Sequence, residues 1–77
     1  MFKKKYKMII KIEGMKCEHC SNRVSSCLKK IENIKKVKIH LDKKEAILYL
    51  NELIDENIVR NKIESIGYEV IEIINKI

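Results

Sequence analysis

The hydrophobic period of the chain switches repeatedly between that of a strand and that of a helix, and this succession constrains the fold most. Residues 6–13, YKMIIKIE, alternate between apolar and polar side chains, which indicates a half-buried strand. From about Cys20 the period becomes helical. The apolar stripe of this predicted helix consists of Val24, Cys27, Leu28 and Ile31. A strand is therefore expected to pass directly into a helix.

The remainder of the chain predicts two further strands, a second helix and a final strand. Residues 35–42 and 45–51 alternate again, and the short polar turn between them predicts a hairpin. Asp55 can cap a second helix, and Gly67 can end it in the left-handed conformation. Residues 68–77 predict a final strand.

The predicted order is strand, helix, strand, strand, helix, strand. This order is typical of the ferredoxin-like α+β fold, in which two helices cover one face of a four-stranded antiparallel sheet. A chain of 77 residues is expected to form one domain, residues 1–77, with its core at about 6–74. The other face of the sheet is expected to stay partly open to water. It would carry Lys7, Ile9, Lys11, Lys38, His40, Ile47 and Tyr49.

The size and the N-terminus of the chain restrict its function and its compartment. So short a chain has too little core to enclose a large substrate cavity, so we do not expect an enzyme. Lys11 and Glu13 interrupt the first apolar run before it reaches the length of a signal-peptide core. We therefore expect a cytoplasmic protein whose cysteines remain reduced.

The net charge of +6 raises the question of nucleic-acid binding, because basic surfaces attract phosphates. The lysines are spread over nearly every segment, however, which is typical of a solvating surface. RNA-recognition modules of the same topology need stacking aromatic residues on the open sheet face, and here that face offers mainly Tyr49. Nucleic-acid binding is therefore a distant alternative.

The motif GMKCEHC, residues 14–20, lies where the first strand passes into the first helix. The positive end of a helix dipole favours a thiolate over a thiol, and Lys16 and Arg23 add positive charge. Cys17 and Cys20 can converge on one ion, and their soft sulfur atoms favour Cu(I), Zn(II) or Hg(II). A site with two protein ligands leaves room for an incoming ligand, which suits a metal carrier.

GMKCEHC after a first strand, with ESIGYEV at the end of the second helix, resembles the heavy-metal-associated domain of small copper chaperones and copper-transporting P-type ATPases. The resemblance implies that Cys17 and Cys20 hold Cu(I) and that Met15 packs beneath the loop. It implies that Tyr68 is the aromatic residue which bacterial relatives carry near the metal. It also implies a bacterial-type carrier. Because the sequence ends with this domain and has no transmembrane segment, we expect a free-standing, soluble copper chaperone. We expect it to pass Cu(I) by ligand exchange to the metal-binding domain of a copper-transporting P-type ATPase.

Several alternatives stay open at this point. A Zn(II) or Hg(II) carrier or a metal sensor could use the same fold, and His19 could ligate a metal or tune the thiolates. Cys27 is expected in the core, because it shares the apolar stripe of the first helix. A thioredoxin-type redox role is disfavoured because that family needs a cis-proline and this chain has no proline.

The chain is expected to be a monomer without metal, and a copper-bridged dimer is an open alternative. Lys16 and Arg23 are expected to contact the partner.

Overall fold

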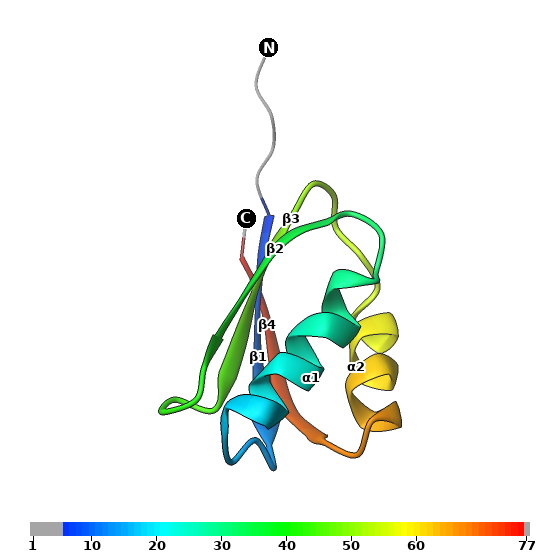
Figure 1. Cartoon of the computed structure of the whole chain (residues 1–77). Helices are drawn as coiled ribbons and strands as arrows, with labels where there is room; N and C mark the ends of the chain where they lie inside the picture. Colours follow the sequence, from blue (N-terminus) through cyan, green and yellow to red (C-terminus); the bar gives the residue numbers. More distant parts are fainter. Residues whose placement is uncertain (1–5, 77) are drawn as a thin grey trace.

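The computed structural model describes residues 6–76, and Figure 1 shows a sheet with both helices on one of its faces. The elements are β1 (Tyr6–Glu13), α1 (Glu18–Lys29), β2 (Ile34–His40), β3 (Glu45–Leu50), α2 (Glu56–Ser65) and β4 (Glu69–Lys76). The strand order in the sheet is β2-β3-β1-β4, and every neighbouring pair is antiparallel. The predicted ferredoxin-like fold is confirmed.

The core lies between the helices and the face of the sheet that they cover. Strand alternation supplies one side of it, because every second residue of β1 and β3 points toward the helices. The fully buried side chains among the described residues include Met8, Ile10, Ala46, Leu48, Val24, Leu28, Val59 and Ile63. Burying one large aliphatic side chain contributes roughly 1.5–3 kcal/mol, so this layer is the main source of stability.

Local sequence signals set the ends of α2. The side chain of Asp55 accepts a hydrogen bond from the backbone nitrogen of Asn57 at 2.9 Å, which satisfies one of the free amides of the first turn. Gly67, just past the last turn, has φ +96°, a conformation that glycine adopts without strain. Both predicted ends are confirmed.

Cys27 is only half-buried, so its expected place in the core was wrong. Val24 and Leu28 face the sheet and are fully buried, whereas Cys27 projects sideways toward α2. Its thiol donates a hydrogen bond to the backbone oxygen of Lys62 at 3.5 Å. The residue therefore sits at the seam between the two helices, where it is distant from the start of α1.

The second face of the sheet is open, as predicted. Its side chains are half-buried or exposed along all the strands described. Within residues 6–76, none of the helices has the length and apolar character needed to cross a membrane.

Candidate metal site

The loop between β1 and α1 is held against the residue that follows Gly67. Gly14 has φ +103°, and a Cβ atom there would lie 3.2 Å from Cδ1 of Tyr68. Glycine meets both the left-handed backbone and this close approach without strain. The start of the motif is therefore fixed on the ring of Tyr68.

The next residues of the loop pass from the core to the surface. Met15 is 5% exposed and belongs to the hydrophobic core. Lys16 and Cys17 are exposed. Met15 thus anchors the loop in the core, and the first cysteine lies at the surface.

Cys17 occupies the N-cap position of α1 with an extended backbone, φ −157° and ψ 176°. Its backbone oxygen accepts a hydrogen bond from the nitrogen of Ser21 at 3.1 Å, which starts the helix. Within this described helix, the Cys17 side chain makes no capping hydrogen bond. The first-turn amides and the positive end of the helix dipole are therefore directed at the segment that carries both cysteines.

The pKa of Cys20 is lowered from 9.0 to about 7. The largest cause is a hydrogen bond from the backbone of Lys16, followed by one from the hydroxyl of Tyr68. Partial burial opposes the shift, and Cys17 adds smaller favourable hydrogen bonds. Near neutral pH about half of the Cys20 side chains are consequently thiolates, the form that binds soft metals.

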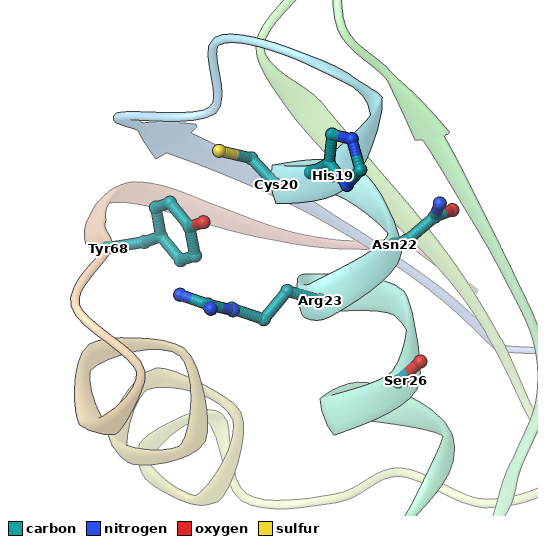
Figure 2. Close-up of a pocket in the computed structure, with 6 residues that line it drawn as sticks. All are labelled: His19, Cys20, Asn22, Arg23, Ser26 and Tyr68. Carbon is teal, nitrogen blue, oxygen red and sulfur yellow. The ribbon is translucent and has the colours of Figure 1, made fainter.

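The hydrogen bond between Tyr68 and Cys20 also shifts the pKa of Tyr68. The pKa of its hydroxyl is raised, first by the hydrogen bond to Cys20, then by burial and by the charge of the thiolate. Arg23 opposes this rise through its charge and a hydrogen bond. Figure 2 shows the sulfur of Cys20, the ring of Tyr68 and the guanidinium of Arg23 on the same side of α1.

An open pocket of about 500 Å³ lies beside Cys20. It is lined by His19, Cys20, Asn22, Arg23, Ser26 and Tyr68. In Figure 2 the ring of His19 projects away from the sulfur of Cys20. Sequence reasoning missed Asn22 and Ser26, although their spacing of three and seven residues from His19 is that of one helix face. It also missed the contact between Gly14 and Tyr68, because no local pattern predicts it.

The structure therefore gathers most of the predicted site residues at one end of the fold. Cys17, Cys20 and Lys16 lie at the start of α1, Met15 packs beneath them, and Tyr68 contacts both the loop and Cys20. The three cysteines, all within the described chain, form no disulfide bond. Residues 6–76 contain no cluster of three or more histidine, cysteine, aspartate or glutamate side chains arranged to hold a metal. The donor set at this end is the pair of thiols, whose softness fits a soft metal ion.

The chain is similar in sequence to known proteins. The model of the heavy-metal-associated domain matches residues 9–69. The copper chaperone CopZ of Staphylococcus epidermidis is 39% identical over 64 residues, which cover 80% of this chain and 93% of that protein. Copper-transporting ATPase 1 of Rattus norvegicus is 30% identical over 60 residues, 77% of this chain and 4% of that protein.

A solved structure supports the same assignment. The structure described as CopZ metallochaperone superposes with a TM-score of 0.77 at 27% identity, and the match covers 84% of this chain and 98% of that one. The family model covers most of the chain, and the staphylococcal relative is similar over almost its whole length. This chain belongs to the heavy-metal-associated domain family.

Proposed function

We propose that this protein is a cytoplasmic copper chaperone that binds Cu(I) through the thiolates of Cys17 and Cys20 and has no enzymatic activity. The observation that carries the proposal is the lowered pKa of Cys20, about 7, beside the exposed Cys17 at the start of α1. A thiolate that is available near neutral pH can bind copper without first losing a proton. The similarity to the staphylococcal copper chaperone supports copper as the cargo.

The two cysteines differ in a way that suits ligand exchange. Cys17 is exposed, whereas Cys20 is half-buried and accepts hydrogen bonds from Lys16 and Tyr68. An incoming thiolate of a partner would therefore reach the copper ion from the side of Cys17. The new sulfur–copper bond would form first and give an intermediate in which three sulfur atoms share the ion, and the bond to Cys17 would then break. A second thiolate of the partner would bind the copper next, and the bond to Cys20 would break last. Copper remains Cu(I) throughout, and the released thiolates take up protons from solvent according to their pKa values.

The partner in this proposal is the metal-binding domain of a copper-transporting P-type ATPase. The support is the likeness of this chain to a segment of such an ATPase. We expect the acceptor domain to carry its own pair of cysteines. Lys16 and Arg23 are exposed on the loop and the adjacent turn of α1. Their charge would speed the encounter with an acidic acceptor more than it would tighten the complex.

A competition experiment tests the two-thiolate site. Cu(I) is titrated into the protein in the presence of a chromophoric Cu(I) chelator, with Cys17→Ser, Cys20→Ser and the matched control Cys27→Ser. We expect either of the first two variants to lose the competition, because serine cannot replace a thiolate for Cu(I). The control should bind like the parent, because Cys27 contacts Lys62 at the seam between the helices. Undiminished binding by Cys17→Ser or Cys20→Ser would refute the site.

A second arm addresses the choice of metal. The same titration is repeated with Zn(II), and the metal content is measured after purification from cells. One copper per chain is the expected result. Zinc that stays bound against mild chelators, with little retained copper, would favour the zinc carrier over the copper chaperone.

A further inference from the structure

The half of the open sheet face that lies farther from the metal-binding loop is rich in lysine. Residues that face each other across antiparallel strands point to the same side of a sheet. The register therefore places Lys36, Tyr49, Lys7 and Lys76 in one row across all four strands. The next row toward the loop begins with Lys38 and continues with three isoleucines of β3, β1 and β4. We define the basic patch as Lys7, Lys35, Lys36, Lys38, Lys76 and Tyr49.

The charges of the basic patch are uncompensated. The row nearest the metal-binding loop contrasts with it, because Glu45 and Glu72 flank Lys11 there. The one ion pair among residues 6–76 joins Lys44 to Glu13, outside the patch. Four ammonium groups, those of Lys7, Lys36, Lys38 and Lys76, thus share these two rows with no acidic side chain.

Aromatic and apolar groups lie among these lysines. The ammonium of Lys7 sits 6.0 Å from the ring centre of Tyr49, at the limit of a cation–π contact. The register shifts between Ile34 and Lys36, which leaves Lys35 as an extra residue at the edge. Beside it is a pocket of about 300 Å³, which is at the small end of ligand sites. It is lined by Tyr6, Lys35, Lys36, Tyr49 and Leu50.

We propose that the basic patch docks this protein on an anionic phospholipid surface. Lysine is a compact charge on a flexible stem, and every cation of the patch is a lysine, so the patch suits diffuse attraction to many lipid phosphates. The neighbouring isoleucines and Tyr49 suit the boundary between headgroups and acyl chains. The pocket beside Lys35 can receive one headgroup phosphate.

A nucleic acid is a poorer occupant of the same surface. Binding of single strands without base pairing depends on aromatic rings that are free to stack with bases. Tyr49 is the aromatic residue of the patch, and Lys7 lies over its ring. The patch also lacks arginine, the side chain that most often reads bases and phosphates with paired hydrogen bonds.

Docking through the basic patch leaves the metal-binding loop free. Lys7 lies near the start of β1 and Gly14 just past its end, about 20 Å apart at the usual rise of a strand. The helices, with the pocket beside Cys20, are on the opposite face of the sheet (Figure 1). A chain bound in this way would hold its cysteines away from the lipid, where a domain of a membrane pump could reach them. The lipid binding itself does not depend on the proposed copper function.

Sedimentation with vesicles tests the proposal. The vesicles are phosphatidylcholine alone or equal parts of phosphatidylcholine and phosphatidylglycerol, at physiological and at high salt. The patch variant carries Lys36→Gln, Lys38→Gln and Lys76→Gln. The matched control carries Lys29→Gln and Lys30→Gln at the end of α1 and Lys62→Gln on α2. Both variants lose the same charge from exposed positions and keep Lys3, Lys4 and Lys5, so any contribution of those residues cancels. Circular dichroism verifies that both variants are folded.

We expect the parent to bind the anionic vesicles, more weakly at high salt, and not to bind the neutral vesicles. The patch variant should bind on the order of 100-fold more weakly, since each lysine near an anionic surface contributes about fivefold. The control should weaken binding by less than about fivefold. Equal weakening by both variants, or no binding by the parent at physiological salt, would overturn the proposal. Tighter, patch-dependent binding to a single-stranded oligonucleotide than to the anionic vesicles would overturn it in favour of nucleic acid.

Discussion

Replacing Tyr68 by phenylalanine isolates the hydroxyl that helps to hold Cys20 as a thiolate. In the parent, the pKa of Cys20 is lowered from 9.0 to about 7, and Tyr68 is the second-largest cause after the backbone of Lys16. The variant keeps the ring against Gly14 and removes the donor alone. We therefore expect the pKa of Cys20 to rise toward 9.0 without reaching it, because the hydrogen bond from Lys16 remains.

The size of the effect can be bounded at pH 7. In the parent about half of the Cys20 side chains are thiolates, whereas a thiol with a pKa of 9.0 would be about 1% ionised. The alkylation rate of Cys20 should consequently fall in the variant, by less than about fiftyfold. The assay is pH-dependent reaction with iodoacetamide, in which mass spectrometry identifies the modified cysteine.

The same shift has a consequence for folding. A lowered pKa in the folded state stabilises the fold fully above the unfolded pKa, here 9.0, and this stabilisation is lost as the pH falls through about 7. Part of this pH dependence of the folding stability should disappear in Tyr68→Phe.

Tyr49→Phe is the matched control, because it removes a hydroxyl from the open sheet face. An unchanged alkylation midpoint in Tyr68→Phe, or an equal change in the control, would refute the reasoning.

Three further variants test other parts of the structure. Gly14→Ala should strain the left-handed backbone and displace Tyr68, so the alkylation midpoint of Cys20 should rise; an unchanged midpoint would mean that this contact does not position Tyr68. Asp55→Ala should lower the free energy of unfolding by about 1 kcal/mol in urea titrations, with unchanged Cu(I) affinity, because the cap of α2 is remote from the cysteines. Lys16→Glu should slow copper transfer to an acidic acceptor domain in stopped-flow mixing and reduce the salt dependence of the rate. A transfer rate that changes neither with the substitution nor with salt would exclude electrostatic steering.

The order of the elements was predictable because each signal is local. The alternation in residues 6–13, the cap at Asp55 and the glycine at position 67 each act within a few residues of the chain. Cys27 was misplaced because an apolar stripe predicts which side of a helix is buried, and it does not separate residues facing the sheet from those facing another helix.

The position of the candidate site was predictable, and its surroundings less so. The positions of Cys17 and Cys20 follow from the motif at the start of a helix. The packing of Gly14 on Tyr68 joins residues 54 positions apart in the sequence, so only the folded structure reveals it. The hydrogen bond from Tyr68 to Cys20 depends on that packing and was equally hidden.

X-ray absorption spectroscopy at the copper edge tests the central claim most directly. The protein is loaded with one equivalent of Cu(I) at a concentration where it is monomeric, and the number and type of atoms bound to copper are measured. Two sulfur atoms and no nitrogen are the predicted result, because Cys17 and Cys20 supply thiolates and the ring of His19 projects away from Cys20. The spectrum should lose this signature in Cys20→Ser and keep it in Cys27→Ser. A coordination shell that contains nitrogen in the parent, or one that changes in Cys27→Ser, would contradict the two-thiolate site.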